Sequence, residues 1–200
     1  STFPGTLGLA AAVLGDQAAG GDAQLISDFA EAVRHEWTAT GLRKGYMYMC
    51  DVVTDPRWQR IYGTFGEDPE LDSDIIARLV AGLQLDELGR NSIATTVKHF
   101  PGGGPRENGF DPHYAEGKWN CYPSAGSFEK YHLPPFRAAV RTSSFIPYYS
   151  APSIKKSVVQ QADGVDIPYE EVGFTFTYFM IDELLRRRMG FTGYINSDSG

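Results

Sequence analysis

Helix-length and strand-length segments alternate along the chain, and this pattern predicts βα units arranged around a parallel sheet. Apolar residues at intervals of three and four predict amphipathic helices, which we expect at residues 22–41, 68–83, 133–140 and 177–190. Short apolar runs between them predict buried strands, which we expect at residues 45–53, 93–100, 144–150 and 194–198. The chain therefore predicts an α/β fold.

Two loops in this pattern are longer than ordinary βα connections, and they cover residues 101–124 and 151–174. Long loops inside a compact domain usually carry function. Both loops follow the carboxyl end of a predicted strand, which is the active-site end in an α/β barrel. The side chains at the strand ends are therefore the first candidates for chemistry.

Composition narrows the classes of function. The 200 residues include 18 Lys and Arg against 25 Asp and Glu, a net charge of −7. This acidic balance argues against a nucleic-acid partner, because binding phosphates needs clustered cations. No apolar run approaches the roughly 18 residues of a membrane span, so we expect no membrane partner. The chain has two Cys and four His, and their spacings match no metal-ligand pattern. We therefore expect neither a metal nor another cofactor. Aromatic residues make up 13% of the chain and suit a sugar ligand.

Polar side chains gather at the predicted strand ends. They are Asp51, Lys98, His99, Tyr149 and Asp198, with Arg60 in the loop after the first strand. Cations donate hydrogen bonds to hydroxyl groups, and a carboxylate can accept, attack or take a proton. A cluster of balanced charge suits a neutral polyhydroxylated ligand. Structural interpretations stay open beside this one: Asp198 as a turn residue, and His99 as a hydrogen-bonded core histidine.

The three glycines at residues 102–104 do not predict a phosphate loop. No Lys followed by Ser or Thr comes after them, and no helix begins promptly. His113 and His132, which lie nearby in the sequence, match no metal-ligand pattern with His99. This part of the chain is therefore interpreted as a loop that borders the strand-end residues.

Four motifs occur in a fixed order along the chain. They are DPRWQR at residues 55–60 with FGEDP at 65–69, KHFPGG at 98–103, LPPFRAAV at 133–140 and FTGYINSD at 191–198. Together they resemble glycoside hydrolase family 3, whose N-terminal domain is a (β/α)8-like barrel. The resemblance implies a partial TIM-like barrel. On this expectation residues 1–200 are part of one catalytic barrel domain that lacks its first strand or strands and the region after the nucleophile strand. The α/β domain that follows the barrel would be absent from the chain.

The resemblance also implies roles for single residues. Asp198 matches the catalytic nucleophile of the family, and Arg60, Lys98 and His99 match residues that hold the sugar hydroxyls. Tyr149 stands where the family often has a tyrosine near the nucleophile, and Asp51 matches an aspartate that we interpret as structural. The implied reaction is retaining hydrolysis of β-linked sugars, in which a second group roughly 5–5.5 Å away protonates the leaving oxygen. We therefore expect an exo-acting β-glucosidase that removes terminal glucose from oligosaccharides such as cello-oligosaccharides.

Departures from the family pattern leave the acid/base residue open. Ser199 replaces the usual tryptophan after the nucleophile, and Gln59 replaces the usual glycine. The β-glucosidase branch takes its acid from the following domain, so we expect the 200 residues alone to be weakly active or inactive. The N-acetylhexosaminidase branch uses a histidine paired with an aspartate, which Asp111 and His113 imitate. The alternatives are therefore a β-N-acetylhexosaminidase using Asp111 and His113, or a non-catalytic carbohydrate-binding barrel.

The sequence gives weaker expectations about partners and location. Trp119 and Tyr122 stand in the loop of residues 101–124. We expect this loop either to overhang the site or to form a homodimer contact. The residues leave the compartment open, and the family resemblance favours a periplasmic or secreted protein over a cytoplasmic one.

Overall fold

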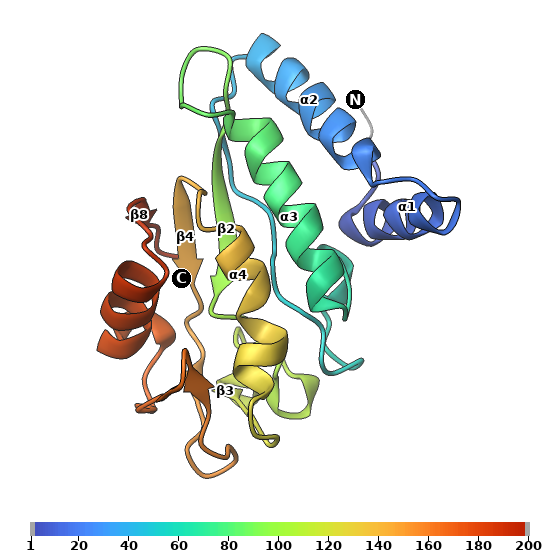
Figure 1. Ribbon diagram of the computed structural model, residues 1–200. Helices are drawn as coiled ribbons and strands as arrows, with labels where there is room; N and C mark the ends of the chain where they lie inside the picture. Colours follow the sequence, from blue (N-terminus) through green and yellow to red (C-terminus); the bar gives the residue numbers. More distant parts are fainter. Residues whose placement is uncertain (1–2, 199–200) are drawn as a thin grey trace.

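A four-stranded parallel sheet in the order β1-β2-β4-β8 is the frame of the computed structural model, which describes residues 3–198 (Figure 1). The strands are β1 (Lys44–Gly45), β2 (Ala94–Phe100), β4 (Ser144–Pro147) and β8 (Tyr194–Ile195). Neighbouring strands run parallel, and a helical segment connects each strand to the next. This arrangement confirms the α/β fold predicted from the sequence.

The described chain forms helices at the four predicted segments and at one further place. They are α1 (Thr6–Ala18), α2 (Gln24–Ala39), α3 (Pro69–Gln84), α4 (Pro134–Ala138) and the π-helical segments η4 (Phe128–His132) and η6 (Phe179–Arg188). Figure 1 shows α2, α3 and α4 in a row along the sheet. The side chain of Asp68 caps α3 by accepting from the N–H groups of Glu70 and Leu71. Helix α1 is not predicted, because alanine and glycine weaken its apolar period.

Short elements complete the described chain. Single 3₁₀ turns are η1 (Ile61–Gly63), η2 (Glu107–Gly109), η3 (Ala115–Gly117) and η5 (Phe174–Phe176). Two small sheets pair β3 (Trp119–Asn120) with β5 (Ala151–Pro152), and β6 (Gln161–Ala162) with β7 (Val165–Asp166). The two long loops expected from the sequence are therefore folded back on short elements of their own.

Three predicted strands are longer than the observed ones. The first was expected at residues 45–53, yet regular pairing covers only β1 and resumes as one bridge between Met49 and Lys98. The N–H of Cys50 donates to the carbonyl of Lys98 at 2.6 Å, so the segment still runs beside β2. Likewise β4 ends at Pro147 and β8 at Ile195, before the predicted ends. In each case the chain leaves the regular sheet as it approaches the carboxyl end.

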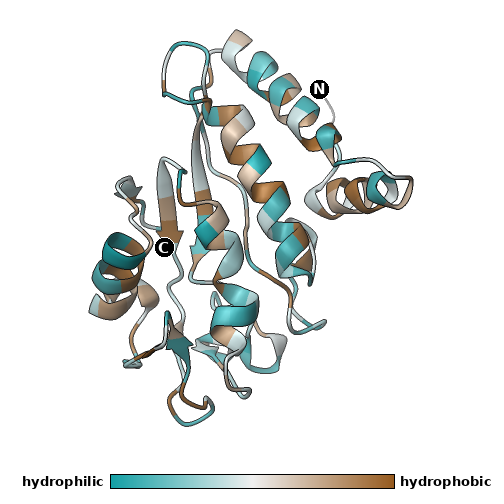
Figure 2. Ribbon diagram, in the orientation of Figure 1, coloured by the Kyte–Doolittle hydropathy of each residue, from teal (hydrophilic) through white to brown (hydrophobic). Residues whose placement is uncertain are grey.

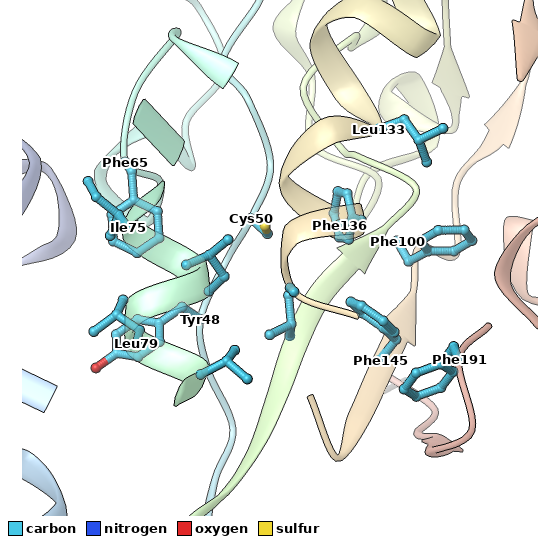
Figure 3. Packing of buried hydrophobic residues seen from close by; sticks show 14 of the residues in the cluster. Tyr48, Cys50, Phe65, Ile75, Leu79, Phe100, Leu133, Phe136, Phe145 and Phe191 are labelled. Carbon is cyan, nitrogen blue, oxygen red and sulfur yellow. The ribbon is translucent and has the colours of Figure 1, made fainter. Parts of the chain in front are cut away.

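Aromatic side chains fill the space between the sheet and the helices. Figure 3 shows Phe136 on α4 facing Phe100 and Phe145 on the strands, with Phe191 beside them. The ring centroids of Phe100 and Phe136 are 5.6 Å apart, and those of Phe145 and Phe191 are 4.8 Å apart. Figure 2 shows hydrophobic and hydrophilic residues on different sides of α2 and α3, as expected for helices with one face in this core. The core therefore fixes the strands whose ends carry the polar residues.

One carboxylate lies on the buried face of α3. Asp72 is fully buried, and neither of its oxygens has a hydrogen-bond partner among the described residues. Burial raises the pKa of Asp72 to about 8, and the charges of Asp68 and Asp51 add to the effect. Asp72 is therefore protonated in the folded protein at neutral pH, because burying the charged form would cost more.

This carboxyl group predicts a pH-dependent stability. The ordinary pKa of 3.8 applies to the unfolded chain, so between about pH 4 and 8 the folded state holds a proton that unfolding releases. The free energy of unfolding should therefore fall as the pH rises through this range. Asp72→Asn should flatten this pH dependence of stability. At pH 8 it should raise the free energy of unfolding by several kcal/mol, the order of magnitude that corresponds to the difference between the folded and unfolded pKa values.

Thermal melts of the full-length protein at pH 5, 6.5 and 8 measure this effect. The control is Asp74→Asn, because Asp74 lies on the same helix with its side chain 40% exposed. Parallel pH profiles for the wild type and Asp72→Asn would show that Asp72 does not hold the proton.

Candidate functional site

A β-bulge in β2 sets the direction of two adjacent side chains. Lys98 pairs with Ile146 and Phe100 pairs with Pro147, so His99 is the extra residue between the two pairs. Neighbouring residues of a regular strand face opposite sides of the sheet, and a bulge changes this direction. Both side chains consequently interact with Asp198. The negative charge of Asp198 favours the charged form of Lys98, and Asp198 Oδ2 lies 3.5 Å from His99 Nε2.

The buried carboxylate of Asp51 fixes the imidazole of His99. Asp51 Oδ2 accepts from the backbone N–H of His99 at 3.1 Å and lies 3.0 Å from His99 Nδ1. The other ring nitrogen, Nε2, is 3.0 Å from Arg60 Nη1. These contacts are satisfied when Nδ1 donates to Asp51 and Nε2 accepts from Arg60. The interpretation of Asp51 as a structural residue agrees with this geometry.

The glycines after β2 allow the chain to pack closely around Asp51. The N–H of Gly103 donates to Asp51 Oδ1. A Cβ at Gly103 would lie 2.5 Å from the ring of Tyr148, and one at Gly104 would overlap the carbonyl oxygen of Val52. Tyr148 in turn packs on His99 with the ring centroids 4.6 Å apart. The glycine run is therefore a close-packed support for His99.

A second chain of contacts begins at Arg60. Arg60 Nε lies 3.1 Å from Asp111 Oδ2, whose side chain is fully buried. The other oxygen of Asp111 contacts His113 Nδ1 and accepts from the backbone N–H of His113 at 3.1 Å. The hydroxyl of Tyr149 lies 2.8 and 2.9 Å from the two ring nitrogens of His113. Tyr149 thus joins the cluster through His113, and Asp111 links it to Arg60.

Tyr46 is a contact of Asp198 that the sequence analysis missed. Its hydroxyl donates to Asp198 Oδ1 at 2.9 Å, and Lys98 Nζ lies 4.2 Å from the centre of its ring. Burial and the bond to Asp198 raise the pKa of Tyr46 to about 12, so this hydroxyl keeps its proton. No motif marks Tyr46. The only signal is a phenol early in the first predicted strand.

The geometry gathers the predicted site residues on one side of the sheet end. Around the carboxylate of Asp198, whose side chain is 12% exposed, lie a hydroxyl, an ammonium group and an imidazole held by a guanidinium. Burial lowers the pKa of Lys98, and the charge of Asp198 opposes this change. Such a carboxylate can accept hydrogen bonds from a ligand or attack an electrophilic carbon.

Tyr122 does not overhang the site, which corrects one expectation for the loop of residues 101–124. It is fully buried and stacks on Tyr169 with the ring centroids 5.7 Å apart. Its ring is apolar enough to pack in the core. The position of Tyr122 in a long loop gave no sign of this burial. Trp119 is half-buried in β3, with Lys118 Nζ 4.8 Å from its ring centre. The homodimer contact through this loop stays a prediction.

Within residues 3–198, no group of three or more His, Cys, Asp and Glu side chains is arranged to hold a metal ion. In the same part of the chain, every helix is too short or too polar to cross a membrane.

The Arg60–Asp111 pair predicts a measurable contribution to stability. Burial alone would raise the pKa of Asp111, but the bonds from His113 and the charge of Arg60 outweigh it and lower the pKa. Asp111→Asn should therefore reduce the free energy of unfolding at pH 7 by about 3 kcal/mol, the usual cost of breaking a buried ion pair.

The pH dependence of this loss tests its cause. A lowered pKa stabilises the folded state above the ordinary pKa of 3.8, and this contribution disappears as the pH falls through the folded value. The difference between wild type and Asp111→Asn in urea unfolding should accordingly shrink below pH 4. Asp86→Asn is the control, because the fully exposed Asp86 pairs with the exposed Arg141 and such surface pairs contribute little. An equal loss in both variants would contradict the assignment.

The sequence of the chain matches known proteins along its whole length. Residues 1–200 match the sequence model described as the glycosyl hydrolase family 3 N terminal domain. The chain is 38% identical over 202 residues to the probable beta-glucosidase C of Aspergillus flavus, covering 100% of this chain and 28% of that protein. It is 36% identical over 202 residues to the periplasmic beta-glucosidase/beta-xylosidase of Dickeya chrysanthemi, covering 99% of this chain and 28% of that protein. The chain thus spans less than a third of the length of these relatives.

Solved structures share the fold. A beta-glucosidase involved in saponin metabolism from intestinal bacteria superposes with a TM-score of 0.78 at 23% identity, over 99% of this chain and 23% of that one. A β-glucosidase from Erythrobacter marinus gives a TM-score of 0.74 at 27% identity, over 99% of this chain and 23% of that one. The likeness confirms the α/β class and the partial barrel predicted from the motifs.

Proposed function

The chain belongs to glycosyl hydrolase family 3, and from this premise we propose that it forms the sugar-binding and nucleophile-bearing part of a retaining β-glucosidase. Relatives named β-glucosidase support the reaction class. The observation that carries the proposal is the set of polar groups around the carboxylate of Asp198. Its two oxygens face the hydroxyl of Tyr46 at 2.9 Å and His99 Nε2 at 3.5 Å, beside the cation of Lys98.

In the proposed mechanism, Asp198 attacks the anomeric carbon of a terminal β-linked glucose. The bond to the leaving oxygen breaks as a glycosyl–carboxylate bond forms, and a second group protonates that oxygen. The same group then removes a proton from water, which attacks the anomeric carbon and releases glucose and the free carboxylate. Family resemblance assigns this second group to a glutamate of the domain that follows the barrel in β-glucosidases.

Arg60, Lys98 and His99 have a common role in this proposal. Lys98 and Arg60 carry donors, and His99 Nε2 lies 3.5 Å from Asp198 Oδ2; polar groups in fixed positions can bind the sugar hydroxyls and stabilise the charge that develops in the oxocarbenium-like transition state. Asp51 and Asp111 hold His99 and Arg60 in place through the contacts described above. Tyr149 belongs to the same cluster, because its hydroxyl contacts the ring of His113. The site is therefore preorganised before a substrate binds.

Terminal glucose of cello-oligosaccharides is the proposed substrate. One relative carries both the β-glucosidase and the β-xylosidase name, and another is named a β-xylosidase. A substrate ending in xylose therefore belongs in the same assays. Two relatives are named periplasmic, which supports a location outside the cytoplasm.

A second candidate is a β-N-acetylhexosaminidase in which His113, oriented by Asp111, is the acid/base. The contact between His113 Nδ1 and the carboxylate of Asp111 favours it. Against it, Asp111 also pairs with Arg60, and the His113 ring is in contact with the hydroxyl of Tyr149. All of these contacts are explained if Asp111 and His113 support Arg60 and Tyr149. We therefore rank the β-N-acetylhexosaminidase reaction second. A non-catalytic carbohydrate-binding barrel ranks third, because the chain keeps Arg60, Lys98, His99 and Asp198 intact.

Replacement of the nucleophile tests the main proposal. In the full-length protein, Asp198→Ala should lower kcat for an aryl β-glucoside by about 10³-fold or more, since removing a covalent nucleophile costs at least this much. The control is Asp86→Ala, because Asp86 is fully exposed and pairs only with exposed Arg141 in the described chain. A 2-fluoro glucoside should label Asp198 in the wild type. A label on another side chain, or wild-type kcat in Asp198→Ala, would refute the role.

Replacement of His113 separates the two enzyme candidates. His113→Ala should leave turnover of an aryl β-glucoside within about tenfold, because the ring supports Tyr149 and is not the acid. The full-length protein should hydrolyse the aryl glucoside faster than the matching aryl N-acetylglucosaminide. The opposite preference, with loss of activity in His113→Ala, would favour the β-N-acetylhexosaminidase.

A further inference from the structure

Side chains from the first and the last strand segments of the four-stranded sheet meet, although β2 and β4 lie between these strands. Lys44 Nζ donates to Asn196 Oδ1 at 3.3 Å. Two positions further along each segment, the hydroxyl of Tyr46 donates to Asp198 Oδ1 at 2.9 Å. Alternate residues of an extended chain share one face, so both contacts lie on the same face of a curved sheet. Together they hold the segment that carries Asp198 against the segment that carries Tyr46.

The hydroxyl of Tyr46 is a lasting donor to the carboxylate. Burial and this hydrogen bond raise the pKa of Tyr46 to about 12, so the phenol keeps its proton at acidic and neutral pH. Lys98 Nζ lies 4.2 Å from the centre of the Tyr46 ring, and a cation at this distance helps to fix the ring. Tyr149, the tyrosine expected near the nucleophile, directs its hydroxyl at the ring nitrogens of His113. The position of the nucleophile carboxylate therefore depends on Tyr46.

The hydrogen bond from Tyr46 changes in strength during the proposed reaction. A donor binds a charged carboxylate more strongly than it binds a neutral oxygen. In the glycosyl-enzyme, the carboxylate of Asp198 has become a neutral ester. The hydrogen bond therefore weakens while this ester forms, and it strengthens while the ester breaks.

We propose that Tyr46 is a positioning residue that assists the second half of the reaction, in which Asp198 leaves the sugar. This role rests on the function proposed above, because it needs Asp198 to be the nucleophile. Water attacks the anomeric carbon, the bond between that carbon and Asp198 breaks, and its electron pair stays on the carboxylate. The water gives its proton to the acid/base group. Tyr46 keeps its own proton and stabilises the charge that develops on Asp198.

Tyr46→Phe in the full-length protein tests this role, because it removes the hydroxyl and keeps the ring beside Lys98. A 2-fluoro glucoside with a good leaving group separates the two half-reactions. The rate of inactivation reports the attack by Asp198, and the rate of reactivation after removal of the reagent reports its departure. Inactivation should stay within about threefold of the wild type. Reactivation should slow by about tenfold, the size expected when a hydrogen bond to a charged group is lost.

Steady-state kinetics give a second measurement. For an aryl β-glucoside with a good leaving group, kcat and KM of Tyr46→Phe should fall together by about tenfold, because the covalent intermediate accumulates. The acidic limb of the kcat/KM profile should move to higher pH, since loss of a hydrogen bond to the charged carboxylate favours its protonated form. The matched control is Tyr62→Phe, because Tyr62 is 76% exposed on η1. This control should leave both rates and the pH profile unchanged.

The outcomes separate this role from the proposed function. Slower reactivation with nearly unchanged inactivation supports the role of Tyr46. Equal slowing of both steps, or reactivation at the wild-type rate, would overturn this role and leave the proposed function standing. A wild type that takes no label on Asp198 would refute the proposed function, and the role of Tyr46 with it.

Discussion

The buried carboxylate of Asp51 connects the parts from which the site is assembled. Its oxygens contact the backbone and the ring of His99 and accept from the N–H of Gly103. A buried anion is tolerated only where donors surround it, so the bulge of β2, the glycine loop and the first strand segment must meet at this point. The direction of His99, and through it that of Arg60, depends on this meeting.

The site also shows how charge is distributed between function and support. Asp51 and Asp111 are each engaged by donors from the protein itself, and both are buried. Asp198 differs, because its side chain is partly exposed and faces the region where the donors of Tyr46 and Lys98 converge. The three aspartates thus differ in environment, and in the proposed mechanism this difference makes Asp198 the nucleophile and the other two its supports.

Much of the fold followed from local patterns. The apolar period predicted α2, α3 and η6 to within a few residues. The ends of the strands were predicted less well, because a β-bulge and single bridges depend on contacts with a neighbouring strand. Helix α1 was missed since its buried face is made by Leu9, Ala10 and Val13 and carries little contrast.

The sequence by itself determined the alternation of helices and strands, the family motifs and the candidate set of Arg60, Lys98, His99 and Asp198. These are encoded locally, in spacing and residue type, so they can be read without a partner. Only the tertiary structure decided that Tyr46 contacts Asp198, that Asp111 pairs with Arg60, and that Tyr122 belongs to the core. Tyr46 and Asp198 are 152 positions apart, and no local propensity specifies which distant groups meet when buried polar atoms find their partners.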